Sequence, residues 1–131
     1  MKIKFLIAEE IRPEMNNKAT VIGLFSDDVV VMTSNRPKDA PPEIPDGIDR
    51  LTFLINVSEI PEGLHKFKGQ IITPTGEPYN PEMTLGEETI KKGLSHSIIV
   101  QLKPFIVKNR GMYKFNVYID DALTSLPFEI R

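Results

Sequence analysis

Apolar and polar residues alternate along several short segments of this chain. Between residues 51 and 57, and again between 113 and 119, every second residue is large and apolar. Successive side chains of a strand point to opposite faces of a sheet, so this pattern predicts strands with one dry and one wet face. Segments 3–7, 98–102 and 126–130 show the same pattern. Strands with one wet face are typical of antiparallel sheets.

The apolar composition also favours strands over helices. The chain has 16 Ile and 8 Val but only 10 Leu and 4 Ala. The β-branched side chains of Ile and Val suit a pleated sheet, whereas Leu and Ala suit helices. The 11 prolines and 8 glycines are spread along the chain and leave little room for long helices.

Turn residues divide the alternating segments into eight predicted strands and a ninth near the end. The predicted strands are 2–11, 18–25, 28–33, 50–58, 65–73, 83–90, 96–104, 112–120 and 123–130. Segment 81–93 stays open between a strand and a short helix, because Glu87-Glu88 and Lys91-Lys92 have helical spacing. Many short strands separated by turns predict an all-β fold, a sandwich of two sheets in a single domain over residues 1–131.

Two prolines and one long loop indicate where this sandwich would meet other chains. Pro104 and Pro127 lack the N–H that a strand donates, so their strands are expected at sheet edges or to bulge there. The loop Ser34–Gly47 contains four prolines and is expected to be extended and stiff. Exposed edges bind other chains through backbone hydrogen bonds. We therefore expect a protein partner, or a second copy of the chain, to bind at an edge strand or at the 34–47 loop.

Four segments together resemble a known family. They are Asn17–Phe25 (NKATVIGLF), Leu51–Val57 (LTFLINV), Gly111–Asp120 (GMYKFNVYID) and Ser125–Ile130 (SLPFEI). The chain resembles, over nearly its whole length, a family of small bacterial β-sandwich proteins described as a domain of unknown function. The resemblance implies an immunoglobulin-like antiparallel sandwich of prokaryotic or phage origin, and it implies no activity and no functional residues. The Gly-rich stretch that this family has after its second strand is reduced here to Gly23.

Gly111 and Tyr113 suggest a structural motif. A tyrosine at the start of a late sandwich strand can donate a hydrogen bond to a nearby backbone carbonyl, an arrangement known as a tyrosine corner. Gly111 would supply the tight turn before it. The alternative is plain core packing, with the hydroxyl of Tyr113 at the rim of the core.

Charge and cysteine content argue against several classes of function. The net charge is −2, whereas a general nucleic-acid binder or a basic membrane-surface protein would be strongly positive. The absence of cysteine excludes disulfides, thiolate zinc sites and a cysteine nucleophile. The apolar run Phe5–Ala8 is too short for a signal peptide or a spanning helix. We therefore expect a cytoplasmic protein that binds neither nucleic acid nor membranes.

The titratable residues show no catalytic or metal-binding pattern. His65 and His96 have no second histidine or cysteine nearby, and Ser95-His96-Ser97 lacks a nucleophile elbow. Adjacent carboxylates such as Glu9-Glu10 point to opposite faces of a strand and so do not form a pair. Four loop aspartates would in principle contribute to a calcium site, although they suit turns equally well. These aspartates are Asp46, Asp49, Asp120 and Asp121. We predict no catalytic residue, no metal and no cofactor.

Basic residues near the strands are interpreted as a solvated sheet face. A single-stranded nucleic-acid site would interleave them with exposed aromatic residues, and Tyr118 is the only obvious outward aromatic residue. Lysines on a sheet also protect its edges from unwanted pairing. The basic residues are Lys66, Lys68, Lys103, Lys108, Arg110 and Lys114.

Two functions follow from this pattern. The preferred one is a non-catalytic interaction or structural module, because a complete sandwich shows no convergent polar chemistry. One version is a homo-oligomer that forms through an outward apolar face, since four aliphatic residues lie on the nominally wet faces. They are Leu6, Leu54, Ile72 and Ile99. The alternative is a small-ligand or metal-binding protein, or an enzyme, that uses loop carboxylates at one end of the sandwich.

Overall fold

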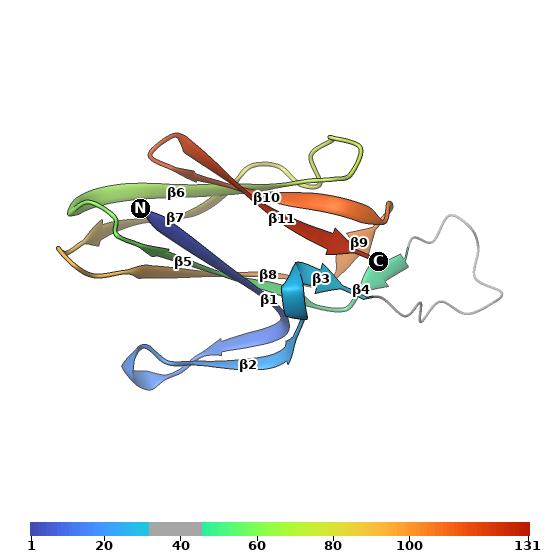
Figure 1. The fold of residues 1–131 in the computed structure, drawn as a ribbon, viewed down its shortest axis with the longest axis horizontal. Helices are drawn as coiled ribbons and strands as arrows, with labels where there is room; N and C mark the ends of the chain where they lie inside the picture. Colours follow the sequence, from blue (N-terminus) through green and yellow to red (C-terminus); the bar gives the residue numbers. More distant parts are fainter. Residues whose placement is uncertain (32–45) are drawn as a thin grey trace.

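Figure 1 shows the fold in the computed structural model, which describes residues 1–31 and 46–131, with the backbone alone at positions 17 and 46. Sheet A consists, in spatial order, of β2 (Ala19–Leu24), β1 (Lys2–Pro13), β5 (Leu51–Ser58) and β8 (His96–Leu102). Sheet B consists of β3 (Val29–Val30), β11 (Ala122–Ile130), β10 (Gly111–Ile119), β6 (Gly63–Ile72) and β7 (Met83–Ile90). A small sheet pairs β4 (Asp46–Ile48) with β9 (Phe105–Val107), and short 3-10 turns lie at Met15–Asn17 and Ser26–Asp28.

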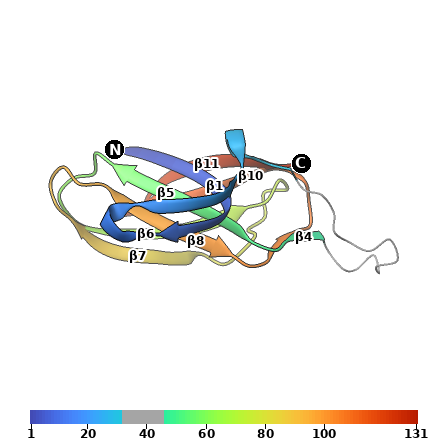
Figure 2. The ribbon, with the colours of Figure 1, turned by 90° about the horizontal axis from the view of Figure 1, so that it is seen from below.

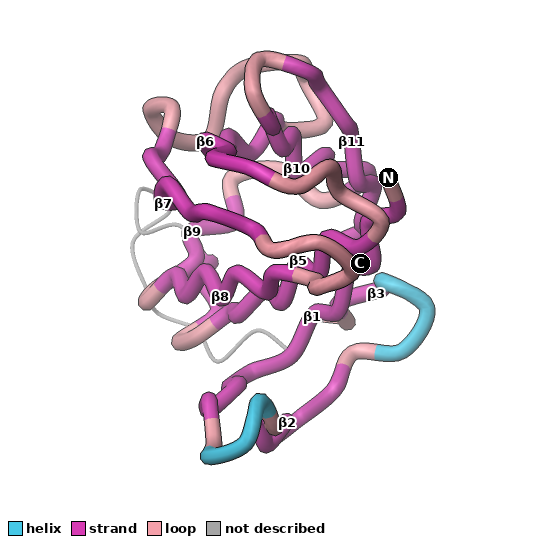
Figure 3. Tube along the Cα trace, turned by 90° about the vertical axis from the view of Figure 1, so that its left-hand side faces the viewer, coloured by secondary structure: helices cyan, strands magenta, loops and turns pink. Residues whose placement is uncertain are grey.

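Sheets A and B form two layers that enclose the core (Figures 2 and 3). The ring of Phe53 in sheet A lies 5.0 Å from that of Phe115 and 5.2 Å from that of Phe128, both in sheet B. Phe5 stacks on Phe53 at a centroid distance of 5.6 Å. The apolar residues that alternate along the sequence therefore meet between the layers in one cluster. The prediction of an all-β fold is confirmed.

Most predicted strands agree with the structure to within a few residues. The open segment 81–93 contains a strand, β7, and no helix. In place of the predicted strand 28–33, the structure has the two-residue strand β3, Val29–Val30. Positions 32 and 33 lie outside the described residues. The predicted strand 96–104 ends at Leu102. Pro104, which cannot donate to a ladder, separates it from β9, which the sequence prediction missed together with β4.

One strand pair departs from the predicted antiparallel arrangement. β3 runs parallel to β11, with Val30 opposite Ile130. Asp27 and Asp28 both have a left-handed backbone, with φ of 58° and 57°. This turn carries the chain from sheet A to sheet B, where the chain continues in the direction of β11. The immunoglobulin-like topology stays a prediction.

The two prolines expected in edge strands differ in position, since Pro104 lies in no strand and Pro127 lies in β11, the second strand of sheet B. Pro104 follows β8, the terminal strand of sheet A. Pro127 lies in β11, outside the two residues of that strand that pair with β3. Positions 34–45 of the predicted loop fall outside the described residues, and its last two residues begin β4. No helix in the described ranges is both long and apolar enough to cross a membrane.

Candidate interaction surface

β2 is an apolar strand that buries none of its side chains. All six of its residues are exposed, with exposed fractions of 38% for Val21, 39% for Ile22 and 53% for Leu24. Every other strand whose side chains are all described has at least one buried residue. Burial of apolar surface is the main favourable contribution to folding. A strand with this composition and no core contact is unusual, and exposed apolar patches are typical of interaction sites.

The exposure of β2 follows from a change of pairing partner along β1. Residues 2–8 of β1 pair with β5, whereas residues 8–13 pair with β2. Where the two pairings separate, the hydroxyl of the buried Thr52 donates a hydrogen bond to the carbonyl of Glu9 (2.9 Å). Beyond this point β1 leaves the body of sheet A, and residues 8–24, here named the arm, project from the molecule (Figures 1 and 3).

Two backbone features shape the arm. At its tip, Asn16 has a left-handed backbone (φ 61°), and the neighbouring Met15 is 83% exposed. At its base, Gly23 has φ of 67°, and a Cβ there would lie 2.8 Å from the side chain of Glu9. Only glycine combines this conformation with so close an approach. Gly23 therefore allows the arm to bend where it joins the body.

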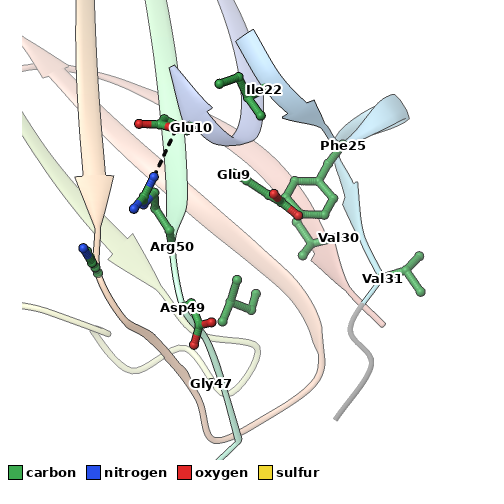
Figure 4. Close-up of a pocket in the computed structure, with 11 residues that line it drawn as sticks. Glu9, Glu10, Ile22, Phe25, Val30, Val31, Gly47, Asp49 and Arg50 are labelled. Carbon is green, nitrogen blue, oxygen red and sulfur yellow. Dashed lines mark ion pairs between the residues drawn. The ribbon is translucent and has the colours of Figure 1, made fainter. Parts of the chain in front are cut away.

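A cleft of about 360 Å³ lies at the root of the arm (Figure 4). On one side of it, Glu10 forms ion pairs with Arg12 (3.2 Å) and Arg50 (3.1 Å). The hydrogen bond from Arg12, together with the positive charges around it, lowers the pKa of Glu10. Nε of Arg50 is buried and has no hydrogen-bond partner within the described residues. The charged residues around the cleft are Glu9, Glu10, Asp49, Arg50 and Lys103, and its apolar wall includes Ile22, Phe25, Val30 and Ile48.

The adjacent glutamates Glu9 and Glu10 both border the cleft but do not form a carboxylate pair. The side chain of Glu9 lies beside Gly23, whereas that of Glu10 contacts Arg12 and Arg50. The alternation of side chains along β1 explains this separation. No shared proton, and hence no acid–base dyad, is expected here.

The outward apolar residues of the sequence do not form one face. Leu6, Leu54 and Ile99 lie opposite one another in a single row across β1, β5 and β8. Leu6 is 39% and Ile99 is 37% exposed, and Leu54 is half-buried. Ile72 lies in sheet B, opposite Lys114, and is not part of the row. The predicted apolar face is therefore reduced to a row of three residues on sheet A.

His65 is engaged through both ring nitrogens. Its Nδ1 donates to the carboxylate of Asp120, and its Nε2 lies 2.6 Å from the carbonyl of Pro61. Because both partners are acceptors, the protonated ring, which has two N–H donors, satisfies both contacts. The hydrogen bond to Asp120, followed by that to Pro61, raises the pKa of His65. The same pair, with a second hydrogen bond from the amide of Lys66 (2.9 Å), lowers the pKa of Asp120. With neither nitrogen free, His65 holds the start of β6 to the β10–β11 turn and has no basic atom for catalysis.

We expect the stabilisation from this ion pair to have a defined pH window. Folding raises the pKa of His65 above 6.5, so its contribution is complete below pH 6.5 and is lost as pH rises through the folded-state pKa. Folding lowers the pKa of Asp120 below 3.8, so its contribution is present above pH 3.8 and is lost only as pH falls through the lower value. NMR titration of His65, and unfolding measured from about pH 4 to about pH 9, test this. His65→Gln should flatten the alkaline decline, and a His65 pKa of 6.5 or lower would contradict the expectation.

The second histidine and its neighbouring serines occupy structural positions. His96 lies opposite Val57 in sheet A, and its ring is 5.0 Å from that of Phe67. The hydroxyl of Ser97 accepts a hydrogen bond from the side-chain amide of Asn56 (2.8 Å). These contacts belong to the sheet and involve no acid, so they do not resemble a hydrolase triad.

The four aspartates considered for calcium do not come together. Asp49 borders the cleft beside β4, whereas Asp120 and Asp121 form the β10–β11 turn at the opposite end of the molecule (Figure 1). The side chain of Asp46 is not described. No group of three histidine, cysteine, aspartate or glutamate residues in the described ranges is placed to hold a metal ion. Positive φ angles of 49° and 71° at Asp120 and Asp121 show that these residues serve the turn.

The basic residues are also dispersed. Lys66 lies opposite Glu87 in the β6–β7 pair, and Lys68 lies 3.5 Å from Glu82. Lys103 borders the cleft at the root of the arm. Tyr118, the outward aromatic residue, is half-buried opposite Lys68. Acidic neighbours of Lys66 and Lys68, and the position of Lys103 at the cleft, keep these three residues from forming one basic surface.

Tyr113 and Gly111 show the geometry of a tyrosine corner. The hydroxyl of Tyr113 donates a hydrogen bond to the carbonyl of Asn109 (2.6 Å), and the residue is 1% exposed. Gly111 has φ of 134°, a conformation that side chains rarely adopt. Burial raises the pKa of Tyr113, so the hydroxyl keeps its proton and remains a donor.

We expect Tyr113→Phe to lower the free energy of unfolding by about 1–2 kcal/mol, because the carbonyl of Asn109 would lose its donor near the core. Urea unfolding measures the loss. Tyr118→Phe is the matched control, since the half-buried Tyr118 has no hydroxyl hydrogen bond in the part of the chain that the structure describes. Equal losses in the two variants would show that the corner hydrogen bond contributes nothing.

Comparison with known proteins adds a family and a fold. A family model described as "Family of unknown function (DUF6941)" matches residues 4–131. This match confirms the resemblance of the chain to a family of unknown function. A search of the curated proteins found no match. One similar solved structure is the alkylpurine DNA glycosylase AlkC of Pseudomonas fluorescens, bound to DNA that contains an abasic-site analogue. The similarity has a TM-score of 0.52 at 12% sequence identity and covers 81% of this chain but 28% of the glycosylase chain, so it shows a shared fold alone.

Proposed function

Because this chain belongs to DUF6941, a family of unknown function, we propose a role from its own surface: a non-catalytic interaction module that binds a protein partner through the arm. A prokaryotic or phage origin, a cytoplasmic location and an immunoglobulin-like topology form part of this proposal. The arm would insert its terminal strand, β2, beside a strand of the partner. The protein would act by holding that partner and would perform no chemistry.

The observation that carries this proposal is the exposure of an apolar strand. Val21, Ile22 and Leu24 are between 38% and 53% exposed, on a strand with no buried residue. β2 ends sheet A, so half of its backbone N–H and C=O groups face outward. A strand added at this edge would satisfy those groups and cover the apolar side chains in one step.

Two of the other edges, β7 and β11, are less suited to strand addition, and β8, the other terminal strand of sheet A, buries Ile98 and Val100 in the core. β7 carries Glu87 and Glu88, and its pairing with β6 shifts register between Phe67 and Lys68. Charges and irregularities of this kind protect edges. β11 contains Pro127, which cannot donate to an added strand. β2 has no charged residue and no proline, and it projects away from the body (Figure 3).

Site-specific photo-cross-linking in cells of the source organism tests the proposal. The probe replaces Leu24 on the arm, and the matched control replaces Leu123 at the β10–β11 turn, because both leucines are 53% exposed. We expect a defined cross-linked protein from position 24 and none from position 123. Cross-linking at neither position, or equally at both, would overturn the proposal.

The cleft at the root of the arm favours a second candidate function, the binding of a small ligand. Its support is the buried Nε of Arg50 without a partner in the described ranges, at the edge of a space of about 360 Å³. A ligand at about 100 times its dissociation constant should stabilise the protein by about 3 kcal/mol. Thermal unfolding against a panel of small carboxylates, which can accept a hydrogen bond from Nε of Arg50, measures this. A flat response, or a response that survives Arg50→Met, would remove this candidate.

DNA binding is not part of the proposal. The DNA in the glycosylase structure is bound by that protein, and this chain resembles 28% of its length. With a net charge of −2, the chain lacks the positive surface that supplies most non-specific affinity for DNA. We expect no change in the fluorescence anisotropy of a labelled DNA duplex at physiological salt, and saturable binding would contradict this expectation.

A further inference from the structure

We infer that the strand that pairs with β2 is β2 of a second copy, in antiparallel orientation. This inference rests on the proposed interaction function and names the partner. The two copies would join their four-stranded A sheets into one continuous sheet through the two arms. The arms project from the bodies (Figures 1 and 3), so the bodies would lie apart when the arms meet.

Charge at the two ends of β2 selects the antiparallel orientation. Lys18 precedes the strand and Asp27 follows it, and the strand between them is uncharged. Neither residue has an ion-pair partner within the described chain. Antiparallel pairing of two copies brings Lys18 of each copy to the end of the strand that carries Asp27 of the other. Parallel pairing would place like charges together, which is unfavourable.

Symmetry limits the register of this pair. In an antiparallel pair, directly opposite residues point to the same face. If the dimer has a two-fold axis perpendicular to the sheet, one residue of β2 must therefore lie directly opposite the same residue of the second chain. The axis passes midway between these two residues. For the six residues of β2, a central axis lies at Val21 or Ile22. The apolar side chains of both copies then gather around the axis, where water is excluded best.

The outer-face row is the competing site for a second copy. Leu6, Leu54 and Ile99 form a single row on sheet A. Asn56 and Ser97 lie opposite one another next to this row, and the row reaches an unpaired backbone edge only at Ile99, on β8. All six residues of β2 are exposed beside its free edge, whereas β8 buries Ile98 and Val100, so we assign the interface to β2.

Size-exclusion chromatography with light scattering over a dilution series tests the assignment. We expect a dimer whose dissociation constant rises by about tenfold or more in Ile22→Lys, because a charge replaces apolar surface at the axis. Ile99→Lys is the matched control, since Ile22 is 39% and Ile99 is 37% exposed. Circular dichroism verifies that both variants fold. A monomeric wild-type protein at all concentrations, equal loss in both variants, or loss in Ile99→Lys alone would overturn the inference.

The absence of cysteine from the chain allows a second, geometric test. Opposite Cα atoms in an antiparallel pair are about 4.5–5.5 Å apart, which suits a disulfide. The residue at the two-fold axis lies opposite the same residue of the second copy. Under mild oxidation, we therefore expect one of the two variants, Val21→Cys or Ile22→Cys, to form a disulfide-linked dimer. Ile99→Cys should stay monomeric on a non-reducing gel. A disulfide from position 99, or none from either arm position, would contradict pairing through β2.

Charge substitutions at Lys18 and Asp27 test whether these residues meet across the dimer. Lys18→Glu should weaken the dimer by about twofold to tenfold, the range expected of exposed ion pairs. Asp27→Asn keeps a residue that tolerates the left-handed backbone at position 27 (φ 58°). In the double variant, the carboxylate introduced at position 18 no longer faces a carboxylate at position 27, so the two effects should be less than additive. Additive effects would show that these residues do not meet.

Photo-cross-linking at position 24 separates this inference from the proposed function. A cross-linked product of twice the mass of the chain supports both statements. A product that contains a different protein, together with a monomeric chain in solution, overturns the second-copy inference and leaves the interaction function standing. The absence of any product overturns both.

Discussion

Replacement of Phe53 with alanine is expected to lower the free energy of unfolding by about 4 kcal/mol. Phe53 is fully buried, and its ring contacts those of Phe115 at 5.0 Å and Phe128 at 5.2 Å in the opposite sheet. Phe5 stacks on it from the neighbouring strand at 5.6 Å. The substitution would remove apolar burial and three aromatic contacts, and it would leave a cavity that two rigid sheets cannot close.

Denaturant unfolding at constant m-value measures this loss. Leu123→Ala is the control, because Leu123 is 53% exposed and should change stability by less than about 0.5 kcal/mol. Total stability of a domain this size is about 5–15 kcal/mol, so Phe53→Ala should remain measurable but marginal. A loss below about 2 kcal/mol would mean that the layers are not held together at this point.

The second large effect is expected from Gly69→Val, which should lower the free energy of unfolding by about 2–3 kcal/mol. Gly69 lies in β6 and faces the core. A Cβ at this position would lie 2.9 Å from Leu85 and 2.9 Å from the ring of Phe115. The end of Leu85 can move, but Phe115 is fully buried among other rings. The added side chain would therefore force Phe115, on the neighbouring strand of the same sheet, from its position in the core.

Comparison within β6 distinguishes overpacking from a general intolerance of the strand. Gly69→Ala, which adds only the Cβ, should cost less than Gly69→Val. Lys66→Val changes an exposed residue of the same strand to one that favours strands, and it should change stability by less than about 0.5 kcal/mol. A neutral or stabilising Gly69→Val would show that the space beside Phe115 is larger than the structure indicates.

These core variants also separate folding from association. The core lies in the body of the two sheets, whereas Val21, Ile22 and Leu24 lie on the arm and have no buried neighbour on β2. We therefore attribute a loss of dimer in Ile22→Lys to the interface, provided that its stability equals that of the wild type. Phe53→Ala should lower stability without a specific effect on the arm.

Local patterns in the sequence predicted much of the fold. The alternation around Phe53 and Phe115 identified which side chains face the core, because the period of a strand depends on adjacent residues alone. The tyrosine corner was also suggested locally, since the acceptor at Asn109 lies only four residues before Tyr113. β4 and β9 were missed because strands of three residues are too short to show a period.

The features of the candidate site are different, since they depend on residues far apart in the chain. The bond between His65 and Asp120 spans 55 positions, and nothing near either residue indicates the other. The hydroxyl of Thr52 reaches the carbonyl of Glu9 across 43 positions. The ion pair between Glu10 and Arg50 at the root of the arm is likewise non-local.

β2 shows most clearly which properties follow from the local sequence and which follow from the tertiary structure. From its sequence, Val21, Ile22 and Leu24 belong to an ordinary half-buried strand, and the strand itself was predicted within one residue of its bounds. In the structure, β1 changes its partner at Ala8, and β2 therefore lies on the arm with no second layer above it. The side to which a residue points is a local property of the backbone. Whether anything covers that side depends on where the rest of the chain lies, and local periodicity contains no information about that.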